Sequence, residues 1–135
     1  MEQTFAIIKP HAVAEGNSGK IIDMIEAAGF EIVRLDKITM TKAQAADLYV
    51  EHKERSFYNG MVATMTSSPV IVMKLQKDGA VLAWRDLMGA TNPASAQAGT
   101  VRALFGKSLD ENAAHGSDSL TSAARELKIF FGGCC

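Results

Sequence analysis

The chain has 135 residues, enough for one hydrophobic core, and we expect a single domain over residues 1–135. Hydrophobic residues make up 47% and charged residues 21%, which is typical of a globular protein and argues against a disordered one. The net charge of −1 and the lack of an apolar run near the roughly 20 residues that cross a bilayer argue against nucleic acid and membranes as partners.

The N-terminus and the cysteines indicate a cytoplasmic protein. Residues 1–4 lack the basic and apolar segments of a signal peptide. The only cysteines, Cys134 and Cys135, are adjacent at the end of the chain, a spacing that fits neither a disulfide framework nor a metal site. We therefore expect a cytoplasmic location and no redox role for this pair.

The first half of the chain predicts two strands and three helices. Gly29 follows the first helix, where it can take the left-handed conformation that ends helices. The second strand loses its alternation between Leu35 and Ile38, which indicates a bulge. Thr41 and Gln44 match a capping box, so a helix begins there. The predicted elements are strands at 5–8 and 32–40 and helices at 21–28, 41–52 and 58–66.

The second half predicts a central strand at 70–73 and a helix capped by Asp78 and ended by Gly89. A short helix begins at Asn92-Pro93, residues 98–111 show no period, and a last helix begins near Ser119. We place the core-facing stripe of that helix at Leu120, Ala123, Ala124, Leu127, Phe130 and Phe131. With a short strand just before His115, the element order predicts an α+β sandwich with helices on one or both faces of a small sheet.

Histidine is the most informative residue type because only three are present. His52 lies in a charged segment and is expected at the surface, whereas the setting of His11 does not decide its role. His115 directly precedes the last helix, where Gly116 and the free N–H groups of a helix N-terminus would suit a phosphate. Glu126 lies on the flank of that helix and can reach back to fix one ring nitrogen, leaving the other nucleophilic. A purely structural His115 is an equally good interpretation of the pattern alone.

Among the cations, only Lys9 has an informative position, at the mouth of the first buried strand. Arg85 and Arg102, taken singly, are typical of solvated surface charges.

Five segments at compatible spacings resemble the nucleoside diphosphate kinase family over essentially the whole chain. They are Ile8-Lys9-Pro10, Phe57-Tyr58-Asn59-Gly60, the run from Arg85 to Ala94, Gly99-Thr100-Val101-Arg102, and the run from Asn112 to Ser119. The resemblance implies a ferredoxin-like βαββαβ core with a four-stranded antiparallel sheet, assembled as a homo-oligomer whose size stays open. It also implies transfer of a terminal phosphoryl group from a nucleoside triphosphate to a nucleoside diphosphate.

The resemblance assigns the chemistry to His115, which would attack the γ-phosphate and carry the phosphoryl group in a ping-pong scheme. Glu126 would orient the imidazole, Ser117 would support that contact, and Tyr49 would lie near the ring. Lys9, together with Arg102, would sit beside the transferring phosphoryl oxygens.

The resemblance assigns nucleotide binding to a second set of residues. Arg85 and Thr91 would hold the β-phosphate, and Asn112 with Lys9 would bind the ribose hydroxyls. Phe57 would stack on the base and Met61 would complete the slot, so that any base is accepted, ATP and GTP included. Mg²⁺ would be held mainly by the nucleotide phosphates rather than by protein side chains.

The sequence departs from the family pattern at His11, usually Asp or Asn, at Ser56, usually Pro, and at Ala98, often Pro. It also ends early, at Cys135. None of these positions belongs to the residues assigned to phosphoryl transfer, so we expect them to affect stability and assembly.

The alternative from another class is a ferredoxin-like module that senses nucleotides without catalysis. Against it stands the presence together of His115, Glu126, Lys9, Arg85 and Arg102, because a sensor needs no nucleophile.

Overall fold

Four strands form one antiparallel sheet in the order β2-β3-β1-β4. The structure, a computed structural model, describes residues 1–109 and 111–132 apart from the side chain of Glu51, so Cys134 and Cys135 lie outside the described residues. The strands are β1 (Glu2–Ile8), β2 (Glu31–Ile38), β3 (Val70–Lys77) and β4 (Ala114–Gly116). As predicted, the run at 70–73 belongs to a central strand, and a short strand occurs at His115.

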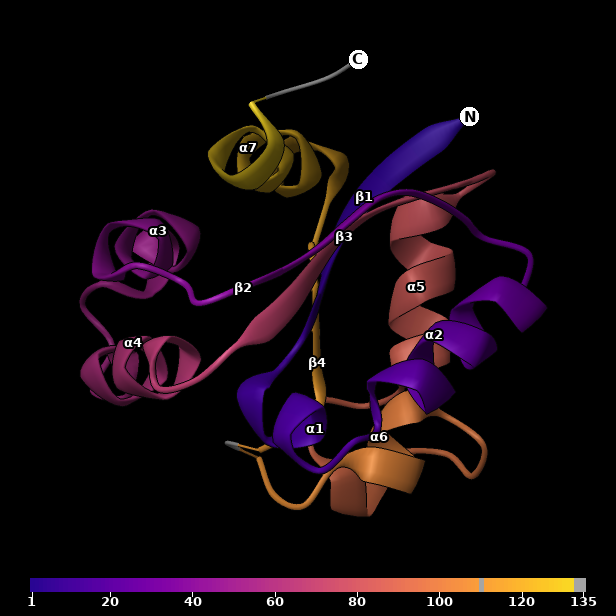
Figure 1. Ribbon diagram of the computed structural model, residues 1–135, viewed down its shortest axis with the longest axis horizontal. Coiled ribbons are helices and arrows are strands. Elements are labelled where there is room, and N and C mark those ends of the chain that lie inside the picture. The colour runs from indigo at the N-terminus through magenta and orange to yellow at the C-terminus, as the bar shows by residue number, and fades with distance from the viewer. Residues whose placement is uncertain (110, 133–135) are drawn as a thin grey trace.

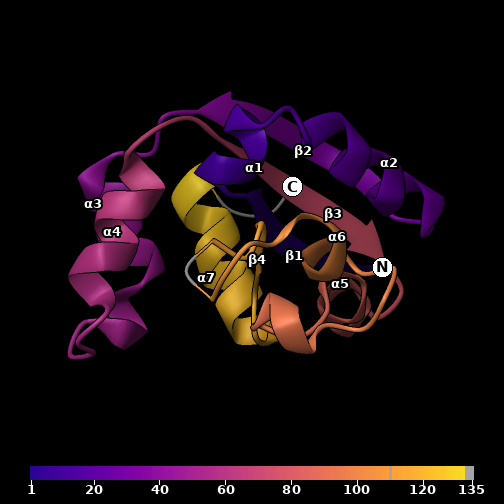
Figure 2. The same cartoon turned by 90° about the horizontal axis from the view of Figure 1, so that it is seen from below.

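Helices cover both faces of this sheet (Figure 1). One face carries α2 (Ser18–Ala27) and α5 (Ala80–Met88), and the other carries α7 (Leu120–Phe131). The pair formed by α3 (Lys42–Leu48) and α4 (Tyr58–Thr66) is inserted between β2 and β3 and extends away from the sheet, as Figure 2 shows. The remaining short helices are α1 (Pro10–Ala14), η1 (Val50–His52), η2 (Pro93–Ser95) and α6 (Val101–Phe105). The architecture confirms the ferredoxin-like βαββαβ sandwich.

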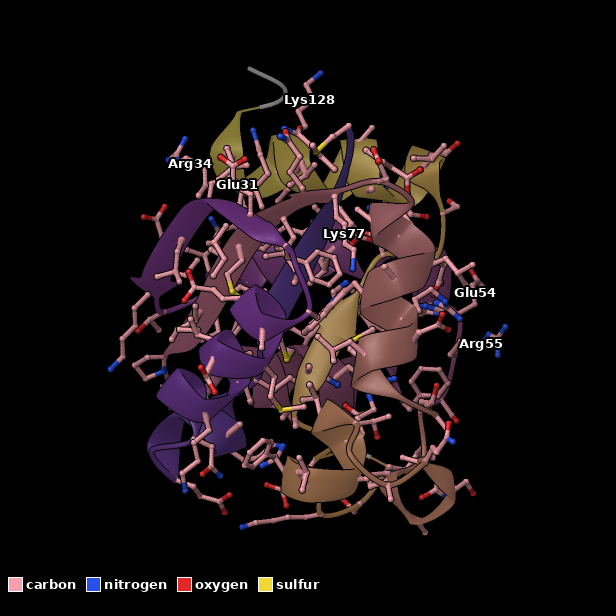
Figure 3. The ribbon with its side chains drawn as sticks, turned by 90° about the vertical axis from the view of Figure 1, so that its right-hand side faces the viewer. Glu31, Arg34, Glu54, Arg55, Lys77 and Lys128 are labelled. Atoms are coloured by element: carbon pink, nitrogen blue, oxygen red, sulfur yellow. The ribbon has the colours of Figure 1, made fainter. Side chains whose placement is uncertain are left out.

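The alternation of β1 divides the core in two. Ala6 and Ile8 point to the α2–α5 face, where they join Trp84 in one apolar cluster, whereas Phe5 and Ile7 join the cluster under α3, α4 and α7. All four strand residues are fully buried. Figure 3 shows Lys77 between α2 and α5, where its ammonium donates to the carbonyl of Ala28 near the end of α2. Because β1 is buried on both sides, its C-terminal end is a rigid base for Lys9.

Several local sequence signals are confirmed. Thr41 and Gln44 form both hydrogen bonds of the capping box at α3. Gly29 has φ +91°, Asn92 accepts the N–H of Ala94 at η2, and Ser119 caps α7 through the N–H of Ser122. Helix α4 has the predicted bounds.

Other predictions about the elements are wrong in detail. The helix expected to run to His52 ends at Leu48 and is followed by η1. The irregularity of β2 lies between Ile32 and Arg34 instead of between Leu35 and Ile38, and the strand ends at Ile38. The N-cap of α5 is Gly79, with φ +64°, and not Asp78.

Two short helices were not predicted, and two core assignments are wrong. Helix α1 follows β1 directly, and α6 occupies part of the segment expected to lack regular structure. Five residues complete little more than one turn, too few for a helical period to be recognised in the sequence. Leu120 opens α7 but is 61% exposed, because it lies in the first turn and outside the buried stripe that contains Ala123 and Leu127. Ala124, which was also assigned to the core, is exposed as well.

Candidate active site

A cavity of about 740 Å³ brings together most residues that the sequence singled out. Its walls come from the α3–η1–α4 segment on one side and from the end of α5, α6, β4 and α7 on the other. Ser117 is fully buried and does not line it. The predicted site residues that line the cavity are Lys9, Tyr49, Phe57, Met61, Arg85, Thr91, Arg102, Asn112, His115 and Glu126.

His115 is held by the sheet and by a buried carboxylate. It lies in β4 opposite Ile7 of β1, and its side chain is 16% exposed. Its Nε2 is 2.9 Å from Oε1 of Glu126, which confirms that Glu126 reaches back along α7 to the ring. The hydroxyl of Ser117 donates to the same oxygen over 2.8 Å. A proton on Nε2 satisfies the buried carboxylate, so the pair fixes the tautomer in which Nδ1 carries the lone pair.

Aromatic rings enclose the imidazole. The ring of Tyr49 lies edge-on to it with centroids 5.9 Å apart, and the ring of Phe5 lies 6.1 Å away. Burial, together with the negative charge of Glu126, raises the pKa of the Tyr49 hydroxyl above its ordinary value, so the phenol stays neutral. His115 therefore has low-dielectric neighbours on these sides, in which its interaction with Glu126 is strengthened.

The lack of a side chain at Gly116 has a role in packing that was not predicted. A Cβ at this position would lie 2.5 Å from the Cε of Met88 and 2.6 Å from the Cδ1 of Trp84. The indole N–H of Trp84 donates to the carbonyl of His115 over 3.1 Å. Gly116 thus lets β4 pack against α5. Residues 119–122 at the start of α7, all of them described, do not line the cavity, so the structure gives no support to the phosphate site expected there.

Arg102 is a buried cation that joins three elements. Its two terminal nitrogens donate to the carbonyls of Gly89, at the end of α5, and Ala114, in β4, over 3.0 and 2.9 Å. Its Nε is buried without a hydrogen bond among the described residues. Burial, followed by repulsion from Arg85, lowers the pKa of Arg102 to about 10, so the guanidinium remains charged at neutral pH. The expectation of an exposed Arg102 is therefore wrong.

The two other predicted cations are held less deeply. Arg85 is half exposed and its NH1 lies 2.6 Å from Oδ1 of Asp118, a cavity residue that was not among the predicted site residues. Lys9 donates from Nζ to Oδ1 of Asn112 over 2.7 Å, and the amide nitrogen of Asn112 donates to the carbonyl of Thr91 over 3.0 Å. These contacts place three positive groups around one end of the cavity, where they would attract phosphate oxygens.

The other end of the cavity is apolar and more open. Phe57 is 45% exposed, and Met61 lies one turn further along α4. The imidazole of His52 is 5.9 Å from the ring of Phe57, tilted by 46°. His52 was expected to be a solvated surface residue, but it is half-buried and lines the cavity. Leu109 also lines it, so this end offers a slot for a flat ring system.

A buried histidine–glutamate pair facing three cations across a nucleotide-sized cavity is typical of a phosphotransferase that acts through a histidine. Comparison with known proteins identifies the family. The family model described as nucleoside diphosphate kinase matches residues 2–134. A protein of that name from Geotalea daltonii is 56% identical over 131 residues, which cover 97% of this chain and 96% of the relative. Its namesake from Geobacter sulfurreducens is 53% identical with the same coverage.

Solved structures agree with this assignment. The nucleoside diphosphate kinase of Aquifex aeolicus superimposes with a TM-score of 0.94 at 35% identity, covering 96% of this chain and 94% of that one. A halophilic nucleoside diphosphate kinase from Halobacterium salinarum, solved in complex with CDP, gives a TM-score of 0.93 at 35% identity, covering 96% and 87%. The chain belongs to the nucleoside diphosphate kinase family, and its activity is the phosphotransfer of that family. The non-catalytic alternative is not favoured.

Among the described residues, no helix is long and apolar enough to cross a membrane.

Proposed function

We propose that the phosphoryl group is carried by Nδ1 of His115. The lone pair of Nδ1 attacks the γ-phosphorus of a nucleoside triphosphate, the bond from that phosphorus to the β,γ-bridging oxygen breaks, and a nucleoside diphosphate leaves. In the second half, a terminal oxygen of a different diphosphate attacks the phosphohistidine and the N–P bond breaks. The contact between Nε2 and Glu126 carries this proposal, because it leaves Nδ1 as the nucleophilic nitrogen.

Glu126 and Ser117 act on the ring rather than on the substrate. The proton stays on Nε2 throughout, donated to Oε1 of Glu126, and the carboxylate stabilises the positive charge that the ring gains as the N–P bond forms. The Ser117 hydroxyl keeps that carboxylate oxygen in place. Tyr49 contributes a neutral wall that limits how the ring can turn.

Lys9 and Arg102 face the oxygens of the transferring phosphoryl group, where charge is spread in the transition state. Arg85 and Thr91 hold the β-phosphate. Support for this division comes from burial, since Arg102 is fixed by two carbonyls whereas Arg85 is half exposed and can exchange Asp118 for a phosphate.

The sugar and base occupy the rest of the cavity. Asn112 and Lys9, already hydrogen-bonded to each other, bind the ribose hydroxyls. Phe57 stacks on the base, with Met61 beside it. Stacking uses the π-face that every base possesses, so ATP, GTP and nucleotides with the other bases are substrates. We propose that the deoxy forms are substrates as well.

Enzymes of this family generally use a divalent cation, and we propose Mg²⁺. Among the described residues, no three His, Cys, Asp or Glu side chains cluster as a metal site, and both carboxylates at the cavity, Asp118 and Glu126, already pair with cationic or imidazole groups. This donor set fits an ion held by nucleotide phosphates, as Mg²⁺ commonly is. Bound there, the ion would neutralise phosphate charge, while Lys9, Arg85 and Arg102 orient the phosphates.

Three expectations drawn from the sequence stay predictions: a single domain over residues 1–135, a cytoplasmic location and a homo-oligomer. Mass measurement in solution distinguishes a dimer, a tetramer and a hexamer.

Incubation with γ-labelled ATP tests the mechanism. We expect a phosphoenzyme that is stable in base, labile in acid and discharged by added GDP or CDP. His115→Ala should form none, and its turnover should fall by at least about 10⁴-fold, as is usual when a covalent nucleophile is removed. Full turnover by His115→Ala, or absence of label on the unmodified enzyme, would show that the mechanism is wrong.

A further inference from the structure

His11 lies outside the cavity but contacts the backbone that forms its wall. Its Nε2 accepts the backbone N–H of Ala113 over 2.9 Å. A backbone N–H can only donate, so Nε2 must carry a lone pair and the ring must be neutral with its proton on Nδ1. The side chain is 8% exposed, and Nδ1 is buried, 3.9 Å from Oε1 of Glu15, without a hydrogen bond among the described residues.

The backbone at Ala113 needs this support. Ala113 has φ +76°, the only positive φ of a non-glycine residue in the described chain, and this conformation is unfavourable for a side chain with a Cβ. It is held from both sides, because the N–H of Lys9 donates to its carbonyl over 2.8 Å while His11 accepts its own N–H. Ala113 directly follows Asn112, whose side chain binds Lys9.

We propose that His11 is a positioning residue that holds Ala113, and through it Asn112 and Lys9, in the geometry that binds nucleotide, and that uptake of a proton at Nε2 releases this hold. The inference rests on the proposed function, which gives Asn112 and Lys9 their contacts with the nucleotide. A protonated ring can only donate, so Nε2–H would oppose the Ala113 N–H and leave that buried donor unpaired.

The surroundings of His11 set the direction of its titration. Burial is the largest effect and lowers the pKa of His11 below the ordinary 6.5. The carboxylates of Glu111 and Glu15 oppose this shift, and the ammonium groups of Lys107 and Lys9 reinforce it. An unfolded chain takes up the proton first, so the stability that His11 contributes is complete above pH 6.5 and is lost as the pH falls below it.

Two variants separate the hydrogen bond from the titration. His11→Gln keeps an acceptor, since its amide oxygen can reach the position of Nε2, but it does not titrate. His11→Leu fills similar space without any acceptor. The measurement is the Kd for a magnesium nucleoside diphosphate between pH 5.5 and 8, which involves no chemistry at His115. Any other group that takes up a proton in this range, the phosphate of the nucleotide included, is common to all three proteins.

At pH 7.5 we expect His11→Gln to bind within about twofold of the unmodified enzyme and His11→Leu to bind about three- to tenfold more weakly, the usual effect of a lost hydrogen-bond acceptor. Below pH 6.5 the unmodified enzyme should lose affinity more steeply than His11→Gln, and its melting temperature should fall more steeply as well. If His11→Leu does not fold, the comparison with His11→Gln still decides.

The inference would be overturned if the Kd of the unmodified enzyme and that of His11→Gln had the same pH dependence. It would also be overturned if His11→Leu bound the nucleotide as tightly as the unmodified enzyme. Labelling of the unmodified enzyme by γ-labelled ATP is measured in parallel. If the label transfers but the profiles coincide, only the role of His11 is wrong; if no label transfers, the proposed function fails and the inference with it.

Discussion

The proposed nucleophile, His115, is oriented by the residues behind its imidazole ring rather than by those that face the cavity. An exposed imidazole exchanges its proton between two nitrogens, whereas His115 has one nitrogen committed to a buried carboxylate. That carboxylate is itself held by Ser117 and lies 3.6 Å from the guanidinium of Arg125. The chain Ser117–Glu126–His115 therefore determines both the tautomer and the orientation of the ring.

Replacing Glu126 tests that chain. Glu126→Gln keeps the size of the side chain but removes its charge, and its amide can present N–H₂ to Nε2, which would favour the tautomer that protonates Nδ1. We expect the rate of phosphoenzyme formation to fall on the order of a hundredfold, because the wrong tautomer has no lone pair for attack. Rapid quenching of single-turnover reactions with labelled ATP measures this rate.

Ser117→Ala is the matched control, because it leaves the carboxylate charged and removes only one hydrogen bond. A loss of about fivefold is expected, in line with roughly 1 kcal/mol for one such bond. A Glu126→Gln enzyme that is phosphorylated as fast as Ser117→Ala would contradict the tautomer argument.

Among the secondary-structure elements, β4 is the shortest strand and the one on which the site depends. It has three residues, and it is stabilised by pairing with β1, by the indole of Trp84 and by the guanidinium of Arg102. The absence of a side chain at Gly116 allows α5 to lie against it. The position of His115 is therefore set by α5 and α6 as much as by the sheet.

Glycine-to-alanine changes test this packing. Gly116→Ala introduces a Cβ into the space of Met88 and Trp84, so we expect the free energy of unfolding to fall by about 1–3 kcal/mol, as overpacked cores usually show. Gly19→Ala, in α2, meets no atom within 4 Å among the described residues and should be neutral or stabilising by about 0.5 kcal/mol. Urea denaturation measures both, and equal stability of the two variants would contradict this account of β4.

The sequence predicted those parts of the fold and site that depend on local chemistry. The capping box at Thr41 and the reach of Glu126 to His115 follow from helix geometry and were confirmed. Arg102 could not be placed correctly, because its burial depends on carbonyls 12 and 13 residues away in the chain and on a five-residue helix. Asp118 and Trp84 enter the site through tertiary contacts, which no spacing in the sequence signals. His52 was missed as well, because only the folded chain shows that it lines the cavity.

At the scale of the whole molecule, the cavity lies between two parts of the chain, which also meet where Arg125 of α7 donates to the carbonyls of Asp47 and Leu48 in α3. The α3–α4 pair extends away from the sheet and carries Phe57 and Met61 (Figure 2). The opposite wall carries the cations and belongs to the layer built on α5, α6 and β4. A nucleotide whose base contacts the first wall and whose phosphates contact the second would join the two, so its binding should be visible in the stability of the entire protein.

Thermal unfolding with magnesium nucleoside diphosphates tests this arrangement. Ligand at 100 times its Kd adds about 2.7 kcal/mol to the folded state, which corresponds to a rise in Tm on the order of 10 °C for a chain of this size. Phe57→Ala should lose part of this rise, and equally for ADP, GDP and CDP, because stacking does not distinguish bases. Leu82→Ala is the control: Leu82 is 66% exposed on α5 and does not line the cavity, so the full rise should remain.

Protein concentration is held fixed in these measurements, since an oligomer has a concentration-dependent Tm. If Phe57→Ala lowered the rise in Tm for one base only, stacking would be contradicted as the source of broad specificity. If Phe57→Ala showed the full rise in Tm with all three nucleotides, Phe57 would be excluded from the base site. The nucleotide would then be bound by the cationic wall alone, without a contribution from the α3–α4 pair.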